Sequence, residues 1–337
     1  MTQTVAAQSD PLLRAAGALL GVPVLRADYQ STPLHGGTLG DVRLISGEAE
    51  AADGSRLPFR IVQKTQKRWE RPGDPASWRR EYDLFSPALS AAFAPSFRAP
   101  RIVHAEIGEQ ENRLWMEYVE GRSGTQLTPD DLERAALELG RFQGRCHQQS
   151  EALRRLGCLG DADYMRRDYA QWTPDTVEYR WLRSGDCTLP NDLQTLLIDT
   201  QEQSDAVFRR LGRLPQVLCH RDYWTENIFA ASGGIVAIDW DCAGWGCVGE
   251  DIASLISDET QPSQIGPYYR LLVPAYVQGL RELISLPPMD DIPIREMILL
   301  KFGYRLLQQV MFARSPEPKE QAIAALQQIG QLPRAVL

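Results

Sequence analysis

Hydrophobic and polar positions follow one period in the first third of the chain and another in the rest. Apolar and polar residues alternate over Arg101–Ile107 and Asn112–Val119, and a period of two predicts β-strands. A further strand is predicted over Phe59–Lys64. Later in the chain the apolar residues recur every three or four positions, which predicts helices. We therefore expect an α+β protein of two lobes, with a small antiparallel β-rich N-lobe over residues 1–117 and a larger, mostly α-helical C-lobe over residues 118–337.

The helical pattern is clearest where it follows Thr128-Pro129-Asp130-Asp131. A Thr cap, a Pro at the first position and an acidic residue three positions after the cap are signals of a helix start. Residues 21–30 predict only an irregular lead-in, and residues 150–190 predict no clear element. Further helices are expected over Leu12–Leu20, Ala76–Phe85, Asn191–Leu211, Pro267–Ile284, Ile294–Ala313 and Lys319–Ile329.

A strand, a loop and a hairpin are predicted between Gln216 and Ala253. The apolar run Val217-Leu218-Cys219 predicts a buried strand that ends at His220-Arg221-Asp222. After a spacer, Asn227 begins a hairpin with a Ser-Gly-Gly turn, and its second strand ends at Asp239. Because a hairpin brings the ends of its two strands together, we expect Asn227 and Asp239 side by side, with Asp222 close to both.

Two carboxylates and one amide oxygen at one point favour a hard cation. Mg²⁺ takes one or two carboxylates, keeps several waters and fills its other positions with substrate phosphates. The alternative is that Asp222 and Asn227 cap a loop while Asp239 ends a strand near solvent. The complete spacing on one strand, loop and hairpin favours the metal site over that alternative.

The pattern His-x-Asp-x4-Asn, followed by an Asp after the next strand, resembles the catalytic loop of the protein-kinase fold. With Asp239-Trp240-Asp241 in place of Asp-Phe-Gly, the chain resembles the aminoglycoside phosphotransferase and choline-kinase-like branch of that fold, which phosphorylates small molecules. Only the segment WDCAGWGCVGE separates Asp239 from Asp251, and it contains no Ser, Thr or Tyr. An activation loop of the protein-kinase kind therefore does not fit. The Gly244-Trp245-Gly246 and Asp251-Ile252-Ala253 elements resemble the same branch.

This resemblance implies a role for each polar residue of the stretch. Asp222 would orient and deprotonate the acceptor hydroxyl, while Asn227 and Asp239 would hold Mg²⁺. One departure is Arg221, which stands where the family usually has Gly after the histidine. We expect this arginine to leave the chemistry intact and to alter the neighbouring substrate surface. Candidates for substrate contacts or for support of the site are His220, Asp241 and Trp245.

The N-lobe supplies the residues that the resemblance assigns to the nucleotide. Lys64 ends a strand where the family has its phosphate-binding lysine, and a point charge on a flexible stem suits a phosphate. Glu81 matches the glutamate that pairs with this lysine, although the adjacent Arg79 and Arg80 leave the register of the helix open. Taken singly, Lys64 and Glu81 could be solvated surface residues. Their order and spacing before Asp222 favour the functional interpretation.

Two further sets of residues would complete a nucleotide site. Gly36, Gly37 and Gly40 lie where the family has the loop that covers the nucleotide, and glycines let a backbone approach phosphates closely; a plain hairpin turn is the competing interpretation. In kinases the strand over residues 112–119 leads into the hinge that meets the adenine edge. The hinge candidates are Glu117, Tyr118 and Val119.

Composition and charge narrow the class of partner. The chain is 43% hydrophobic and 24% charged, which is ordinary for a globular protein. Its net charge of −8 comes entirely from residues 118–337, which carry 22 basic and 30 acidic residues. This argues against a nucleic-acid partner and is compatible with a cationic substrate.

Targeting and cysteine patterns are absent from the sequence. It has neither the apolar run of a membrane span nor a signal-peptide pattern, so we expect a cytoplasmic protein without a membrane partner. The six cysteines show no zinc or disulfide spacing, and we expect them to be reduced residues in or near the core.

The resulting hypothesis is an ATP- and Mg²⁺-dependent phosphotransferase that acts on a hydroxyl of a small molecule. Aminoglycoside-, amino-alcohol- and sugar-like acceptors all stay open, with a mild preference for a cationic one, and GTP stays an alternative to ATP. Two other functions compete: a catalytically silent nucleotide-binding regulator on the same fold, and a metal-dependent hydrolase that uses Asp222, Asp239 and Asp241. The sequence leaves the oligomeric state open.

Overall fold

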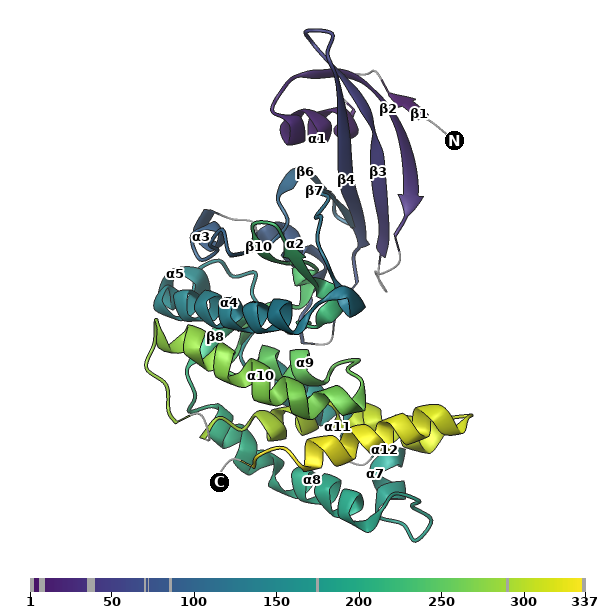
Figure 1. Ribbon diagram of the computed structural model, residues 1–337, viewed down its shortest axis with the longest axis vertical. Helices are drawn as coiled ribbons and strands as arrows, with labels where there is room; N and C mark the ends of the chain where they lie inside the picture. Colours follow the sequence, from purple (N-terminus) through teal and green to yellow (C-terminus); the bar gives the residue numbers. More distant parts are fainter. Residues whose placement is uncertain are drawn as a thin grey trace.

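An antiparallel sheet and a set of helices form two ends of an elongated molecule (Figure 1). The computed structural model describes residues 3–5, 10–34, 40–69, 71, 73–84, 87–173, 176–288 and 291–334. The sheet belongs to the N-terminal part of the chain and most helices to the rest, so the predicted α+β class is confirmed.

The N-terminal sheet has the strand order β1-β2-β3-β4-β7-β6, with antiparallel neighbours throughout. Helix α1 (Pro11–Leu20) packs its Leu12 and Leu13 against a small core that includes Phe59 and Trp115. The strands are β1 (Gln3–Val5), β2 (Val24–Pro33), β3 (Gly40–Ala51), β4 (Arg56–Lys67), β6 (Ile102–Ile107) and β7 (Glu111–Glu117).

Strand β2 corrects the prediction of an irregular lead-in over residues 21–30. Much of the strand is polar because it lies near the edge of the sheet, where few of its side chains are buried. It pairs with β3 along its whole length, and these backbone hydrogen bonds do not depend on a hydrophobic pattern.

The rest of the chain is mainly helical, with two small sheets, β5-β10-β9 and β11-β8. Its strands are β5 (Phe97–Arg98), β8 (Gln216–Cys219), β9 (Ile228–Ala231), β10 (Gly234–Ala237) and β11 (Gly244–Cys247), with 3-10 helices η1 (Gly124–Gln126), η2 (Thr225–Asn227) and η3 (Trp240–Cys242). The helices are α2 (Ser77–Leu84), α3 (Pro87–Ser90), α4 (Pro129–Gln148), α5 (Ser150–Arg154), α6 (Tyr164–Trp172), α7 (Val177–Leu182), α8 (Asn191–Leu211), α9 (Glu250–Ser257), α10 (Pro262–Arg281), α11 (Ile294–Phe312) and α12 (Pro316–Gly330).

Helices α4 and α10 pack closely side by side (Figure 1). A Cβ on Gly140 would lie 2.2 Å from the Tyr276 carbonyl oxygen, and one on Gly279 would lie 2.2 Å from the Leu137 carbonyl oxygen. A glycine on each helix therefore lets the two backbones approach.

Helix α10 also corrects a predicted boundary. The sequence predicts a helix over Pro267–Ile284. The helix instead begins at Pro262 and contains both Pro267 and Pro274. The apolar face of the helix, which includes Ile265, Leu272 and Tyr276, is buried. This tertiary packing stabilises the helix in spite of its two interior prolines.

Two general properties of the chain concern its environment. Within the described ranges, no helix combines the length and the apolar character needed to cross a membrane. All six cysteines have free thiols, and four of them, Cys146, Cys158, Cys219 and Cys247, are buried.

The start of α4 gives a stability prediction. Thr128 Oγ1 accepts from the Asp131 backbone N–H at 3.2 Å, and Asp131 accepts from the Thr128 backbone N–H at 3.0 Å. Arg122 donates to the same carboxylate at 2.8 and 2.9 Å and holds the pKa of Asp131 well below its usual value. Because Arg122 is half-exposed, we expect Asp131→Ala to lower the free energy of unfolding by only about 1–2 kcal/mol.

This loss can be measured by urea unfolding, with exposed Asp130→Ala as the matched control in the same turn. A lowered pKa in the folded state means that Asp131 stabilises fully above the ordinary carboxyl pKa and loses this effect as the pH falls through the lowered value. The difference between the two variants should therefore shrink in strong acid. Equal losses for both variants at neutral pH would contradict the capping role.

Candidate active site

The loop after β8 is held by a buried carboxylate. Asp251, in the first turn of α9, accepts hydrogen bonds from the backbone N–H groups of His220 and Arg221, both at 2.7 Å. Arg221 has φ 71°, a left-handed conformation that is unfavourable for a residue with a side chain. The Asp251 carboxylate thus fixes the loop in a shape that carries Asp222 next to it.

The hairpin of β9 and β10 brings the predicted residues together. Ala237 pairs with Ile228, and the Ile238 N–H donates to the Asn227 carbonyl oxygen at 3.0 Å. Asn227 and Asp239 therefore lie at the same end of the hairpin. The Asn227 side chain also donates to Asp222, at 2.8 Å to Oδ2 and 2.9 Å to the carbonyl oxygen.

Lys64 joins the N-terminal sheet to this group. Its Nζ donates to Glu81 Oε2 at 2.7 Å and to Asp239 Oδ1 at 2.5 Å. Burial alone would lower the pKa of Lys64, but the two carboxylates outweigh it and raise that pKa. For Asp239, burial favours a higher pKa, but the Lys64 ammonium group leaves the pKa below its usual value. Lys64 is therefore charged and shared between two carboxylates.

Arg80 fixes the helix that carries Glu81. Its guanidinium is almost completely buried and forms a double ion pair with Asp74. It also donates to the Cys158 carbonyl oxygen at 2.7 Å and to the Asp241 carbonyl oxygen at 2.8 Å. These hydrogen bonds hold helix α2 against the loop that follows Asp239. The register of this helix, which the sequence left open, directs Glu81 inward to Lys64.

Lys64, Asp222 and Asp239 border a cavity of about 410 Å³. One side has Lys64, Asp222, Asp239 and Asp241, and the other side is formed by α6 and by Arg305 of α11. Its arginines are paired: Arg71 with Asp241 at 3.8 Å, Arg167 with Asp161 at 2.8 Å and Arg305 with Asp258 at 3.1 Å. Carboxylates and a buried lysine thus border a space that a small molecule could enter.

The sequence matches the profile of the phosphotransferase enzyme family over residues 32–284. The chain belongs to the phosphotransferase enzyme family. The predicted enzyme class, a small-molecule phosphotransferase, is thereby confirmed. A search of curated proteins gave no significant match.

Solved structures of small-molecule kinases share the fold of this phosphotransferase. A microcompartment-associated aminopropanol kinase aligns with a TM-score of 0.55 at 18% identity, over 90% of both chains. The GDP complex of aminoglycoside 2'-phosphotransferase-IIIa aligns with a TM-score of 0.56 at 13% identity, over 89% of this chain and 92% of the other. Choline kinase from Cryptosporidium parvum Iowa II gives 0.53 at 15%, over 90% and 88%. The predicted protein-kinase-like fold and the family resemblance are both confirmed.

Sequence reasoning missed the α6 side of the phosphotransferase cavity. Tyr164, Asp168 and Trp172 are four residues apart and line the cavity together. Trp172 is 43% exposed and stacks on Tyr304 of α11, with ring centres 5.6 Å apart. A spacing of four was visible in the sequence, but a helix of only nine residues between turn signals gave no clear pattern.

Of the three glycines predicted to cover the nucleotide, the structure describes Gly40. Gly40 lines the cavity, and a Cβ there would lie 2.2 Å from the Thr65 carbonyl oxygen, so glycine is needed for packing against β4. Gly36 and Gly37 lie outside the described residues.

The hinge candidates differ in their surroundings. The Glu117 carboxylate is engaged by Arg98 and by the Arg101 backbone N–H at 2.9 Å. Tyr118 and Val119 border a separate cavity of about 300 Å³ beside the hairpin turn.

His220 and Trp245 lie outside the described lining of the cavity that contains Lys64 and Asp222. The His220 ring is buried, with Nε2 2.8 Å from the Ile238 carbonyl oxygen, and so connects the loop to the strand before Asp239. The Trp245 indole lies under the Arg154 guanidinium, 4.1 Å from the ring centre. The His220 ring thus supports the loop that carries Asp222 from outside the cavity.

The oxygen donors of the phosphotransferase fit a hard cation. Within the described part of the chain, no three His, Cys, Asp or Glu side chains form a metal site by themselves. Mg²⁺ needs fewer protein ligands, because it keeps waters and binds substrate phosphates. Asp239 already holds a cationic group, the Lys64 ammonium, and Asp241 lines the same cavity, while the Asn227 amide is hydrogen-bonded to Asp222. Burial and the Asp239 charge raise the pKa of Asp241, although the Lys64 and Arg71 cations act in the opposite direction.

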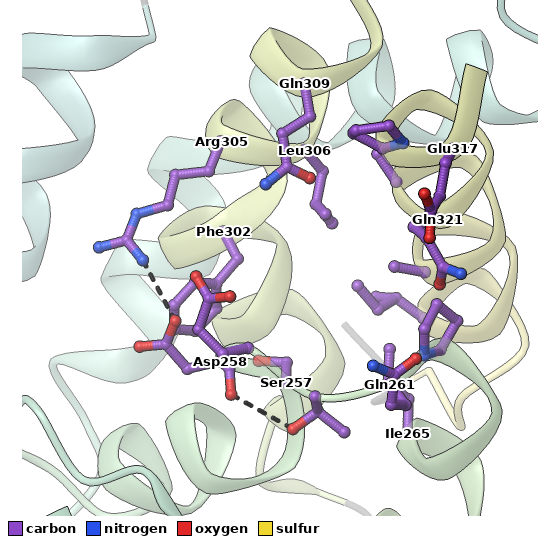
Figure 2. Close-up of a pocket in the computed structure, with 17 residues that line it drawn as sticks. Ser257, Asp258, Gln261, Ile265, Phe302, Arg305, Leu306, Gln309, Glu317 and Gln321 are labelled. Carbon is purple, nitrogen blue, oxygen red and sulfur yellow. Dashed lines mark hydrogen bonds and ion pairs between the residues drawn. The ribbon is translucent and has the colours of Figure 1, made fainter. Parts of the chain in front are cut away.

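A second cavity of about 390 Å³ lies between the end of α9 and helices α10, α11 and α12. Figure 2 shows Arg305 at its edge, with the guanidinium directed to Asp258. Arg305 lines both this cavity and the larger one. The two spaces are therefore neighbours that share one ion pair.

Proposed function

We propose that this phosphotransferase transfers the γ-phosphoryl group of ATP, with Mg²⁺, to a hydroxyl of a small molecule. The observation that carries the proposal is the position of Lys64, bound to Glu81 at 2.7 Å and to Asp239 at 2.5 Å beside Asp222. One cavity therefore combines a cation for the phosphates (Lys64), a carboxylate for the metal (Asp239) and a carboxylate for the acceptor (Asp222). GTP stays the alternative donor.

Asp222 acts on the acceptor. Its carboxylate is oriented by Asn227 and accepts the hydroxyl proton as the acceptor oxygen forms its bond to the γ-phosphorus and ADP departs with the electrons of the broken P–O bond. Lys64 binds the α- and β-phosphates, and Glu81 holds its ammonium group in place. Asn227 and Asp239 would hold Mg²⁺, which neutralises phosphate charge when bound. Most of the acceleration comes from alignment and charge neutralisation.

The acceptor side of the cavity suits a cationic molecule. Among the described residues, Asp168 has neither a hydrogen-bond nor an ion-pair partner, although it is half-buried in the cavity. The exposed face of Trp172, one helical turn later, offers an aromatic surface on which a cation is stabilised. The arginines nearby are each paired with a carboxylate. A hydroxylated amine would place its ammonium group between Asp168 and Trp172.

We infer further that the nucleotide-binding lobe covers residues 1–117 and the catalytic and acceptor lobe residues 118–337, with Glu117, Tyr118 and Val119 as the adenine-facing hinge. We also propose that the enzyme works in the cytoplasm on a diffusible substrate.

The test is Mg²⁺-dependent ADP release with four acceptors: 1-amino-2-propanol, choline, kanamycin and glucose. We expect stimulation by at least one of the three amines, loss of activity on removal of Mg²⁺ with EDTA, and no stimulation by glucose. GTP in place of ATP in the same assay identifies the donor.

Each alternative predicts another result. A catalytically silent regulator would bind Mg²⁺-ATP without ADP release, and a hydrolase would release phosphate at the same rate with and without an acceptor. Either result would contradict the proposed transfer reaction.

A further inference from the structure

Arg221 has a backbone conformation that its side chain makes unfavourable. Its φ of 71° is adopted freely by glycine and at a cost by arginine. Such a residue persists only where its surroundings require it. The side chain is almost fully buried, although it belongs to the loop that carries Asp222. An arginine at this position must therefore contribute contacts that a glycine lacks.

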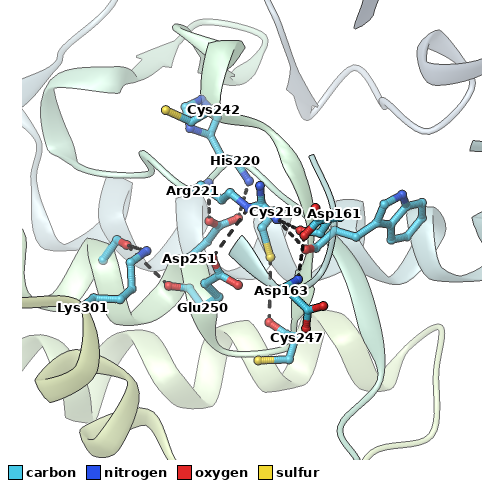
Figure 3. Close-up of polar contacts among 12 residues, drawn as sticks. Asp161, Asp163, Cys219, His220, Arg221, Cys242, Cys247, Glu250, Asp251 and Lys301 are labelled. Atoms are coloured by element: carbon cyan, nitrogen blue, oxygen red, sulfur yellow. Dashed lines mark hydrogen bonds and ion pairs between the residues drawn. The ribbon is translucent and has the colours of Figure 1, made fainter. Parts of the chain in front are cut away.

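Those contacts connect the segment in front of α6, and Tyr164 at the start of that helix, to β11 and α9. Arg221 Nη2 donates to the Asp161 carbonyl oxygen at 2.5 Å and to the Trp245 carbonyl oxygen at 2.6 Å (Figure 3). The guanidinium also lies over the Tyr164 ring, 4.5 Å from its centre. Glu250, 3.8 Å away, supplies a buried carboxylate for the charge.

Two glycines make room for this guanidinium. A Cβ on Gly160 or on Gly244 would lie 2.4 Å from Arg221 Nη1. The same two residues bring their backbones together, because the Trp245 N–H donates to the Gly160 carbonyl oxygen at 2.8 Å. The guanidinium therefore fills a space between the segment before α6 and the strand β11.

Helix α6 forms the acceptor side of the cavity, with Tyr164, Asp168 and Trp172. We propose that Arg221 is a positioning residue for the acceptor: its guanidinium fixes the start of α6 relative to the neighbouring Asp222. The inference rests on the proposed function, because it assigns the acceptor to this side. It predicts that Arg221 sets acceptor affinity and leaves the nucleotide side, which is held separately by Arg80, unaffected.

Arg221→Gly is the main variant, because glycine suits the backbone conformation and the protein should fold. We expect it to raise the acceptor KM by about tenfold or more, since small misplacements of a substrate-binding wall have effects of that order. The nucleotide Kd should stay within about twofold of wild type. Arg221→Lys should recover part of the loss, because lysine donates to the carbonyls without the planar fork. The matched control is Arg166→Ala, an exposed arginine of α6 that pairs with Asp205.

Gly160→Ala provides an independent way to displace the guanidinium. Its Cβ meets Arg221 Nη1 and has no closer neighbour, so the variant should raise the acceptor KM in the same direction. In the double variant Arg221→Gly with Gly160→Ala the added methyl group loses its clash and keeps an ordinary contact with Asp74 Oδ2 at 3.4 Å. The double variant should therefore bind the acceptor no worse than Arg221→Gly alone.

Hydrogen–deuterium exchange without substrates tests the anchoring apart from catalysis. Faster exchange over residues 164–172 in Arg221→Gly than in Arg166→Ala supports the inference, even if none of the four acceptors is phosphorylated and the proposed function fails. Unchanged exchange there overturns it. So does an acceptor KM within about twofold of wild type, an equal loss of nucleotide affinity, or full additivity in the double variant.

Discussion

Replacing Asp222 by Asn lowers the rate of phosphoryl transfer by about 10²- to 10⁴-fold, the usual contribution of a positioned general base. The amide keeps the shape of the side chain, so its hydrogen bond with Asn227 and the fold around it should persist. What is lost is the oxygen that accepts the hydroxyl proton. Nucleotide affinity should stay within about twofold of wild type, because Lys64 and Glu81 keep their contacts.

The measurement is steady-state ADP release with the best acceptor, together with calorimetric titration of the nucleotide. Lys64→Met should instead weaken nucleotide binding as well as lower the rate, because it removes the cation for the phosphates. Asp205→Asn, an exposed carboxylate on α8, is the control and should match wild type. If Asp222→Asn kept its turnover within about threefold of wild type, the base would have to be another residue.

The juxtaposition of Asp222, Asn227 and Asp239 could be predicted because it depends on local structure. A strand, a spacer of fixed length and a tight hairpin determine which ends meet, and each has a clear sequence signal. The Lys64–Glu81 pair was predictable only through the family resemblance. These two residues lie on different elements, and no local rule brings a strand and a helix together at a given register.

The acceptor side could not be predicted in the same way. Helix α6 is short, and its place in the cavity depends on the buried contacts of Arg221 and on the ring of Tyr304, which is distant in the sequence. Arg80 shows the same limit. In the sequence Arg80 only left the register of the helix open, whereas in the structure its guanidinium is buried because Asp74 and two carbonyl groups satisfy it.

Asp251→Asn is expected to destabilise the protein by about 2–4 kcal/mol, since it breaks a buried group of hydrogen bonds. The Asp251 side chain is completely buried and accepts three of them, from the His220 and Arg221 backbones and from Gln143 Nε2 at 2.8 Å. An amide has one acceptor oxygen, and its NH₂ group would face donors. At least one buried N–H is then left without a partner.

The effect should extend beyond the loop, because Asp251 belongs to a chain of buried contacts. Gln143 accepts from the Tyr276 hydroxyl at 2.5 Å, and Tyr276 accepts from the Gly249 N–H at 3.0 Å, so α4, α9 and α10 are connected through it. Denaturant unfolding measures the stability. Asp186→Asn, on an exposed loop, is the control and should change it by less than about 0.5 kcal/mol.

Catalysis gives this variant a second and more specific readout. Asp251 accepts hydrogen bonds from the backbone N–H groups of His220 and Arg221, the two residues before Asp222. The second of these hydrogen bonds holds Arg221 in its strained backbone conformation. Without that carboxylate the loop should relax away from φ 71°, so turnover at a temperature where the variant is folded should fall by about tenfold or more. A variant as stable and as active as wild type would mean that the loop keeps its shape through β8 and the hairpin alone, and Asp251 would then be only a partner for Gln143.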